Sequence, residues 1–251
     1  MTLVARDQAS LEAARAGLLG NGHRALSLDV ADDEGWQRLS NELDGVHGLV
    51  CAAAVIGPIG PIGSYSLSDF RQTLDINVLG TMNAIRACLP SLSANGGAIV
   101  TFSGGGATAP LPRFDAYAAS KAAVVRLTEN MSGTLAEEGV RINCVAPGFV
   151  ATDIHKSTLA AGPELAGGDY YQRTLDELSQ GGVPASEAAE LVCMLLEGGT
   201  DATFTGKLIS AQWDPWREDS FSLRLSEQAV LATLRRIDNQ LFTTAEKRAS
   251  A

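Results

Sequence analysis

Tyr117 and Lys121, in the run Tyr-Ala-Ala-Ser-Lys, are the residues whose types and spacing most readily suggest chemistry. If this segment is helical, side chains four residues apart lie on one face, with Cβ atoms about 5–6 Å apart. An ammonium group that close favours the phenolate and lowers the tyrosine pKa below its usual value of about 10. The pair therefore predicts a general acid or base that works near neutral pH. Composition alone places such a spacing in very roughly a third of chains of this length, so the motif needs support from its surroundings.

The elements around this pair alternate between short β-rich runs and longer helical patterns. Strands are predicted at Thr2–Ala5, Arg24–Leu28, Gly48–Ala53, Ala98–Phe102, Val140–Val145 and Lys207–Ala211. Helices are predicted from a cap at Asp7 to about Leu19, from Asp32 and Asp33 to about Leu43, after a capping residue at Ser66, in a longer helix through Leu92, from Asp115 to Glu138, and from a cap at Ser186 to about Glu197. This alternation predicts an α/β fold with a doubly wound parallel sheet. We expect a single domain over residues 1–218 and a C-terminal helical extension over residues 219–251, where Leu223–Phe242 has helical periodicity.

Three further segments surround the Tyr–Lys pair in a fixed order. Asn77 lies upstream in DINVLGT, a strand ending IVTFSGGG comes next, and RINCVAPGFVAT follows about twenty residues after Lys121. From about Thr2 to Ala211 this order resembles the short-chain dehydrogenase/reductase family. The resemblance implies a Rossmann-like fold and hydride transfer between NAD(P)(H) and a carbonyl/alcohol substrate. It implies that Tyr117 moves the proton, that Lys121 lowers the tyrosine pKa and bonds the nicotinamide ribose, and that Asn77 holds a water of the proton relay. The alternative for Asn77 is an amide that only bonds nearby backbone.

The resemblance also implies a set of cofactor contacts. They are Asp29 and Val30 at the adenine, Ala52 and Ala53 in the cofactor wall, Pro147 and Gly148 beside the nicotinamide, Thr152 on its carboxamide, and Tyr117 with Lys121. In this family the residue at the end of the strand that corresponds to Thr2–Ala5 decides between NAD and NADP. NAD-preferring members commonly carry an acidic residue there, which hydrogen-bonds the ribose 2′-hydroxyl. Ala5 and Arg6 stand there, and a guanidinium suits a 2′-phosphate, so we predict NADP over NAD. The alternatives are a solvent-facing Arg6 at a helix entry and an Asp29 that serves as a turn or cap residue.

The chain departs from the family pattern at its start. The family opens with a strand and a Thr-Gly-x-x-x-Gly-x-Gly turn that lays the pyrophosphate on backbone N–H groups, whereas only Met1 precedes Thr2–Ala5. That strand is central in the family, so its absence leaves Thr2–Ala5 and Gly48–Ala53 without a shared neighbour. Each orphaned buried backbone group costs about 1–3 kcal/mol. We expect the true start to lie upstream, the alternative being a damaged product.

A second departure concerns the catalytic serine. Family spacing places it thirteen residues before the tyrosine, which is Gly104 here. Ser103 is the candidate substitute, although alternation along a strand turns its hydroxyl away unless a bulge re-aims it. Thr108 is a weaker substitute. Cys51 and the alanines after it also replace side chains that contact the cofactor in the family.

Composition limits the partners. With 19 Lys and Arg against 29 Asp and Glu, the formal charge is −10, which disfavours nucleic acid. The four cysteines lie tens of residues apart in apolar stretches, so we expect buried thiols and no metal site. No segment approaches the roughly 20 apolar residues of a membrane span, and no signal-peptide pattern opens the chain. These features predict a cytoplasmic protein without a membrane partner.

Two classes of function follow. The first is an oxidoreductase acting on a small-molecule carbonyl/alcohol pair, with Ala151–Pro184 covering the ligand crevice and determining the substrate. The second is a catalytically impaired scaffold or partner subunit, because the phosphate loop is absent and position 104 is glycine. The resemblance implies a homodimer or homotetramer formed through two long helices, and the Ala118–Val125 face is compatible with that. Trp213 and Trp216 either line a pocket or pack the tail.

Overall fold

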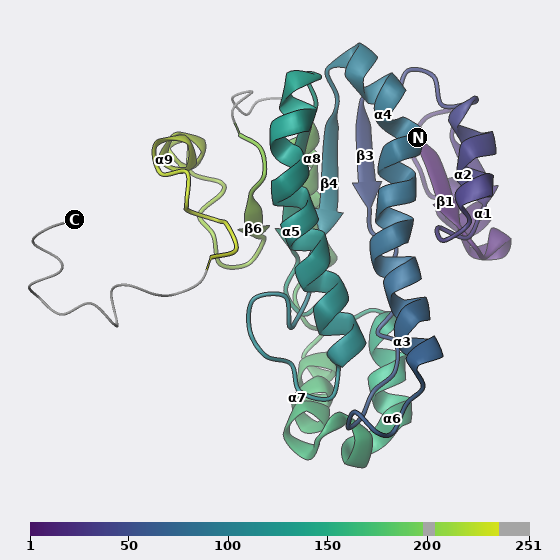
Figure 1. Cartoon of the computed structure of the whole chain (residues 1–251), viewed down its shortest axis with the longest axis vertical. Coiled ribbons are helices and arrows are strands. Elements are labelled where there is room, and N and C mark those ends of the chain that lie inside the picture. Colours follow the sequence, from purple (N-terminus) through teal and green to yellow (C-terminus); the bar gives the residue numbers. More distant parts are fainter. Residues whose placement is uncertain (198–203, 236–251) are drawn as a thin grey trace, which may run out of the picture.

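The computed structural model describes residues 1–197 and 204–235. The strands are β1 (Thr2–Ala5), β2 (Arg24–Ser27), β3 (Gly48–Cys51), β4 (Ala98–Phe102), β5 (Arg141–Ala146) and β6 (Leu208–Ser210). The helices are α1 (Gln8–Ala16), α2 (Asp33–Ser40), α3 (Leu67–Leu74), α4 (Gly80–Asn95), α5 (Asp115–Glu137), α6 (Lys156–Ala166), α7 (Gly168–Ser179), α8 (Ala185–Leu196) and α9 (Phe221–Glu227). A π-helical turn, η1 (Asp75–Leu79), leads into α4, and a 3₁₀ turn, η2 (Asp153–His155), leads into α6. Strands and helices alternate as predicted (Figure 1).

The strands form two parallel sheets. One pairs β1 with β2, and the other has the order β3-β4-β5-β6. The predicted α/β class with a parallel sheet is therefore confirmed. Within the described residues no strand lies between β1 and β3, as expected for strands without a shared neighbour. The lack of a neighbouring strand on that side of β3 is reflected in side-chain exposure. Val50 of β3 is 42% exposed, whereas its partner Val100 of β4 is fully buried.

Helix α4 covers both sheets from one side (Figure 1). Its buried side chains Ile85, Cys88 and Leu92 belong to one core cluster with Trp36 and Leu39 of α2. That cluster takes in side chains of both sheets, which are Val4, Leu26, Leu49 and Ile99. Side-chain packing, and not a shared ladder, joins the two sheets on this side.

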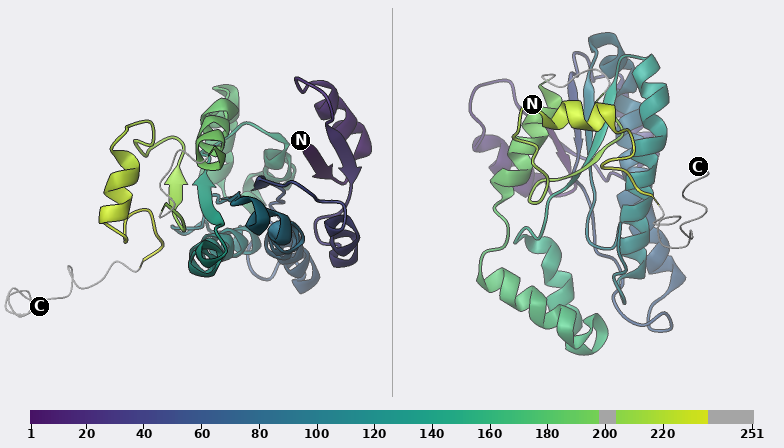
Figure 2. Two further views of the ribbon diagram at one scale, coloured as in Figure 1. Left: turned by 90° about the horizontal axis from the view of Figure 1, so that it is seen from above. Right: turned by 90° about the vertical axis from the view of Figure 1, so that its left-hand side faces the viewer.

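A second core cluster fills the other face of the larger sheet, under α8 (Figure 2). Leu191 and Leu195 of α8 pack there with strand residues, and Phe221 of α9 joins them. Trp216 is 7% exposed and donates its indole N–H to the carbonyl of Ala211 at 2.9 Å, whereas Trp213 is 79% exposed. Trp216 therefore packs the tail onto the core, and Trp213 does not.

Three of the predicted helix caps are confirmed. Asp7, Asp32 and Ser66 each accept a hydrogen bond from a backbone N–H three residues ahead. The cap predicted at Ser186 is wrong. Helix α8 begins at Ala185 with Pro184 at the N-cap, because proline fixes a backbone angle that suits a helix start.

The stretch Ala151–Pro184 holds two helices, α6 and α7, that its weak periodicity did not predict. Glycines explain the weak signal, since Gly162 breaks α6 with non-helical backbone and Gly167 separates the two helices. In the tail, α9 ends at Glu227, so the predicted helix from Leu223 is wrong beyond that residue within the described part. Residues 236–251 lie outside the described residues, and the domain boundary at 218/219 stays a prediction.

Replacing Trp216 with Ala should lower the free energy of unfolding by about 3–5 kcal/mol, because a large buried side chain is lost from the core. Trp213→Ala is the matched control and should change stability by less than about 0.5 kcal/mol, since that ring lies in solvent. Urea unfolding of the three proteins measures both values. Equal effects of the two substitutions would contradict the assigned packing.

Candidate active site

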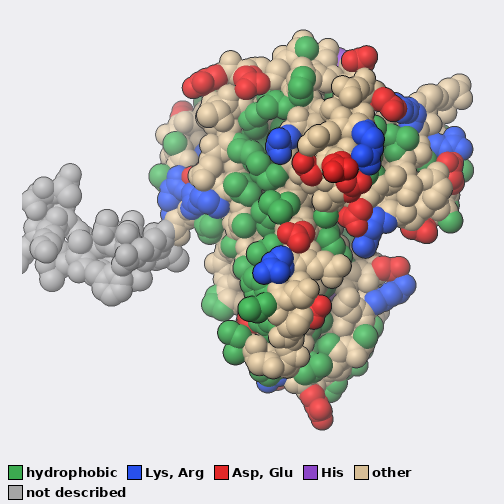
Figure 3. Space-filling model, turned by 45° about the vertical axis from the view of Figure 1, so that its right-hand side comes forward, with side chains coloured by type: hydrophobic (Ala, Val, Ile, Leu, Met, Phe, Trp, Pro, Cys, Tyr) green, Lys and Arg blue, Asp and Glu red, His purple; other side chains and the backbone are tan. Residues whose placement is uncertain are grey.

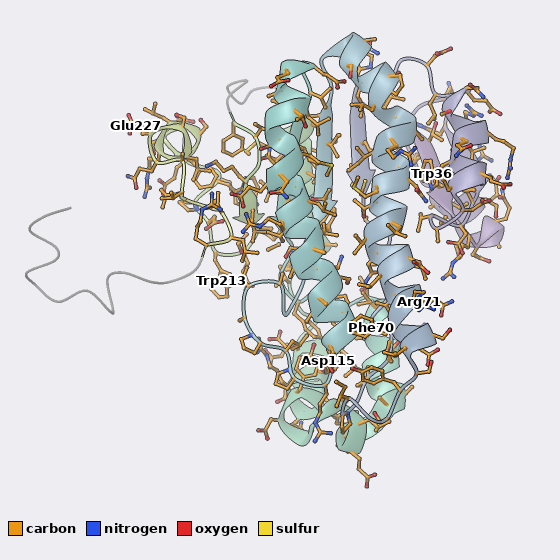
Figure 4. The ribbon with its side chains drawn as sticks, in the orientation of Figure 1. Trp36, Phe70, Arg71, Asp115, Trp213 and Glu227 are labelled. Carbon is orange, nitrogen blue, oxygen red and sulfur yellow. The ribbon has the colours of Figure 1, made fainter. Side chains whose placement is uncertain are left out.

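Tyr117 and Lys121 lie in the first two turns of α5, at the end where the strands of the larger sheet finish. Asp115, labelled in Figure 4, marks this end of α5, and α6 and α7 lie next to it. Helix α5 has no break between Tyr117 and Lys121, so the predicted shared face is present. The Lys121 nitrogen lies 5.8 Å from the centre of the Tyr117 ring. The structure thus brings the two predicted catalytic side chains together.

Lys121 is only 4% exposed, which is unusual for an ammonium group. Its Nζ donates a hydrogen bond to the Phe102 carbonyl, at the end of β4, over 3.0 Å. Burial lowers the pKa of Lys121 to about 8, because the charged form loses hydration, and the nearby Cys144 opposes this shift. Near neutral pH the side chain still carries a proton most of the time, and it loses that proton in mildly alkaline solution.

The phenol of Tyr117 behaves in the opposite way to the prediction. The pKa of Tyr117 is raised to about 12, mainly by burial and to a smaller extent by the nearby Tyr170. The prediction that Lys121 brings this pKa below 10 is therefore wrong for this structure. The cost of burying the phenolate exceeds its attraction to the Lys121 ammonium. This is because the Tyr117 ring packs into an apolar cluster, while Lys121 Nζ is directed at the Phe102 carbonyl.

Asn77 lies in the π-helical turn η1, 1% exposed. Its Oδ1 accepts the Val55 N–H at 2.8 Å, and its Nδ2 donates to the Val55 carbonyl and to Ser120 Oγ, each at 2.9 Å. Both amide hydrogens are used, which matches the alternative of an amide that bonds nearby backbone. A π-helical turn is common at functional sites. The link from Asn77 through Ser120 to the Tyr117 carbonyl was not predicted, because Ser120 carries no signal of its own.

Gly104 and Ser103 follow β4 beside the tyrosine. Ser103 is 5% exposed, and its N–H donates to the Val145 carbonyl, which extends the β4–β5 ladder by one residue. A Cβ added at Gly104 would lie 2.3 Å from the Tyr117 hydroxyl oxygen. The phenol hydroxyl therefore occupies the space that any side chain at position 104 needs. Thr108 is exposed.

At the other end of the predicted cofactor site, Arg6 and Asp29 approach each other. Their side chains are 62% and 44% exposed, and Arg6 Nη1 lies 3.9 Å from Asp29 Oδ2. Asp29 Oδ1 also accepts the Ala31 N–H at 3.0 Å, as in a turn. An exposed pair of this kind contributes little, about 0–1 kcal/mol, so the guanidinium is free to exchange it for another anion.

The backbone after β2 is held by two side chains that the sequence did not single out. Trp36 Nε1 and Asn83 Nδ2 both donate to the Val30 carbonyl, at 3.0 and 3.1 Å. Ala52 and Ala53, after β3, are both exposed. The two alanines predicted in the cofactor wall therefore present small side chains to solvent.

Pro147, Gly148 and Thr152 lie beyond the end of β5. Gly148 has φ of 80°, and a Cβ there would lie 2.9 Å from Val183 and 3.0 Å from Gln212. Those two side chains line an open depression of about 360 Å³ with Glu177, Gly182, Pro184 and Glu187. The fit to a nicotinamide cofactor is mixed. Small residues suit its two ends. The glycine-rich segments that lead from a strand to a helix in the described residues, GPIGPIG after β3 and SGGG after β4, lie in long loops (52–66 and 103–114) and not in a tight turn at a helix N-terminus that could cradle a phosphate.

The remaining titratable groups offer no second centre. Within the described residues no cluster of His, Cys, Asp or Glu could hold a metal ion. Burial raises the pKa values of Cys51, Cys88 and Cys144, as expected of inert thiols. The prediction fails for Cys193, which is exposed on α8. No helix in the described part is long and apolar enough to span a bilayer.

Comparison with known proteins places this chain in a family. Residues 1–210 match a sequence model described as enoyl-(acyl carrier protein) reductase. The oxidoreductase asL5 of Sarocladium schorii is 34% identical over 158 residues, which cover 61% of this chain and 63% of that protein. The inactive 2-(S)-hydroxypropyl-CoM dehydrogenase 2 of Xanthobacter autotrophicus is 33% identical over 173 residues, 66% of this chain and 74% of that one. A solved short-chain type dehydrogenase/reductase from Mycobacterium ulcerans has a TM-score of 0.70 at 26% identity, covering 83% of this chain and 78% of that one.

The chain belongs to the short-chain dehydrogenase/reductase family. It spans less than two thirds of asL5, its match covering 63% of that relative's length. Position 104, where we predicted the family serine, is glycine, and the Tyr117 hydroxyl lies against the place of its missing Cβ.

Lys121→Met should remove a pH dependence of stability. Between the folded pKa of about 8 and the usual value of 10.5, the unfolded chain binds more protons than the folded chain. The wild type should therefore gain free energy of unfolding relative to the variant as the pH rises through this window, by up to about 3 kcal/mol. Urea unfolding of both proteins between about pH 7 and pH 10 measures the difference. A difference that stays constant would show that Lys121 is not a desolvated ammonium.

Proposed function

We propose that the chain is an NAD(P)(H)-dependent oxidoreductase that interconverts a small-molecule carbonyl compound and its alcohol. The observation that carries this proposal is the pair of a partly buried Tyr117 and a buried Lys121 on one face of α5. A buried ammonium near a partly buried phenol costs stability, which is a reason to assign the pair a chemical role. We place the protein in the cytoplasm, in line with its reduced thiols.

In the proposed reaction the bound nicotinamide supplies or accepts the hydride. Tyr117 holds the proton that passes to the substrate oxygen in reduction, and takes it back in oxidation. Its raised pKa keeps the phenol protonated near neutral pH, which suits proton donation to a carbonyl. Lys121 uses one hydrogen on the Phe102 carbonyl and can direct the others toward the cofactor ribose or the phenol.

The other predicted site residues, together with Ser120, take supporting roles in this proposal. Ser120 and Asn77 fix the first turn of α5 from behind, because Asn77 bonds Ser120 and Ser120 bonds the Tyr117 carbonyl. A water relay at Asn77 then needs an atom other than its two amide hydrogens. Pro147, Gly148 and Thr152 border the nicotinamide, and Ala52 and Ala53 the cofactor wall. Asp29 and Val30 contact the adenine.

The proposed cofactor is NADP, with Arg6 as the residue that selects it. Its guanidinium is exposed and only loosely paired with Asp29, so a ribose 2′-phosphate can displace that carboxylate. We further propose a homodimer or homotetramer built on α4 and α5. The face turned to the viewer in Figure 3 carries a lane of hydrophobic side chains, and Leu79, at the start of α4, is 52% exposed.

A second candidate is a catalytically impaired family member that serves as a partner subunit. Three observations favour it, namely glycine at position 104, a phenol pKa of about 12, and a relative whose name describes it as inactive. This candidate predicts binding to an intact homologue without turnover of its own. One assay of the purified chain, NADPH oxidation with small carbonyl compounds, distinguishes the two candidates.

Tyr117→Phe should lower carbonyl reduction by about 100-fold or more, because proton transfer loses its donor. NADPH oxidation with a panel of small aldehydes and ketones measures the rate, and NADPH fluorescence should show that the variant still binds the cofactor through its other contacts. Tyr171→Phe removes a hydroxyl from the neighbouring α7 and is the matched control. Absence of turnover in the wild type with bound NADPH would favour the partner-subunit candidate instead.

Arg6→Ala should weaken NADPH binding by about tenfold and leave NADH binding unchanged, because only the 2′-phosphate meets the guanidinium. Arg38→Ala on α2 is the control, since Arg38 is also exposed and paired with a carboxylate. Titration of each variant with both cofactors gives the affinities. Equal losses for the two cofactors would contradict the proposed selection.

A further inference from the structure

We propose that Arg113 is a positioning residue that fastens the α6–α7 pair over Tyr117. The effect on catalysis rests on the proposed function, whereas the fastening itself does not. Helices α6 and α7 project beyond the ends of the strands, near the first turn of α5 (Figures 1 and 2), and Tyr170 and Tyr171 of α7 share an apolar cluster with Tyr117. What holds them there decides how Tyr117 meets a substrate.

The backbone of Arg113 adopts an uncommon conformation. Its φ is 73°, a left-handed value that a side chain other than glycine rarely takes. Its carbonyl accepts the N–H of Gly60 at 2.8 Å, so the loop after β3 holds this backbone in place. A strained residue persists where its surroundings determine it, which points to a use for the side chain that it directs.

The guanidinium of Arg113 bonds the end of α6. Its Nη1 donates to the carbonyl of Glu164 at 2.5 Å and to that of Leu165 at 3.3 Å. These carbonyls lie in the last turn of α6, after the break at Gly162, where a helix leaves its acceptors unpaired. A cation at the carboxyl end of a helix is favourable on both counts, through hydrogen bonds and through the dipole.

The next residue adds an apolar contact to the same helices. Phe114 is fully buried, and its ring centre lies 4.6 Å from that of Tyr170 on α7. Phe114, Tyr170 and Ala166 belong to one cluster in which Tyr117 also packs. Arg113 and Phe114 therefore fix α6 by polar contacts and α7 by apolar ones, next to the cluster in which the proposed proton donor packs.

Arg113→Met keeps the length of the side chain and removes its donors, and it tests the fastening without a substrate. Amide hydrogen exchange in α6 and α7 should become about tenfold faster, while exchange in β4 and β5 stays unchanged. Arg113→Gly should have the same effect, although it relieves the backbone strain. Arg113→Lys, which keeps a donor, should restore most of the protection. Arg71→Met is the control, because Arg71 is an exposed arginine on α3 (Figure 4).

Unchanged exchange in α6 and α7 of Arg113→Met, or an equal change in Arg71→Met, would overturn the proposal. In an active enzyme, Arg113→Met should raise KM by about tenfold with kcat within about twofold, because the proton donor is intact and only its cover is loosened. A loss confined to kcat would also overturn the positioning role. If no turnover is found but exchange responds as expected, the proposed function fails and the fastening stands.

Discussion

The packing of α4 against both sheets is the interaction on which the rest of this structure depends. β1 pairs only with β2 and β3 only with β4 among the described residues, so no ladder connects the two sheets. Side chains of α4 and α2 meet residues of both sheets in one apolar cluster. Burial of apolar surface has no directional requirement, which allows it to join two sheets whose backbone groups are not paired with each other. The larger sheet then provides the edge at which α5 places Tyr117 and Lys121.

At the proposed active site, burial determines the chemistry more than proximity does. The spacing of Tyr117 and Lys121 puts a cation near a phenol, yet each group is moved toward its neutral form. Attraction between the ionised forms offsets desolvation only where geometry is close, and here Nζ bonds a carbonyl instead. The site as it stands thus favours a neutral phenol. A cofactor or substrate that added hydrogen-bond partners at the phenol oxygen would stabilise the phenolate and lower its pKa.

Local sequence signals predicted the alternation of elements, the parallel α/β class and several caps, because each depends on residues within one turn. The shared helical face of Tyr117 and Lys121 follows from the same kind of local geometry. The reversal of the Tyr117 pKa could not be predicted, since it depends on rings from α7 and loops far away in the sequence. Helices α6 and α7 were missed because glycines interrupt their periodicity. Asn83 and Trp36, which hold the Val30 carbonyl, are ordinary residues until the fold brings them to it.

The open flank of β3 has a consequence for strand addition. Its backbone groups on that side face no strand of the described residues, and Val50 exposes an apolar side chain there. Such a flank is a template onto which an extended segment of another molecule can add. A strand added there would cover the exposed side chain of Val50 and bond backbone groups that have no partner strand among the described residues.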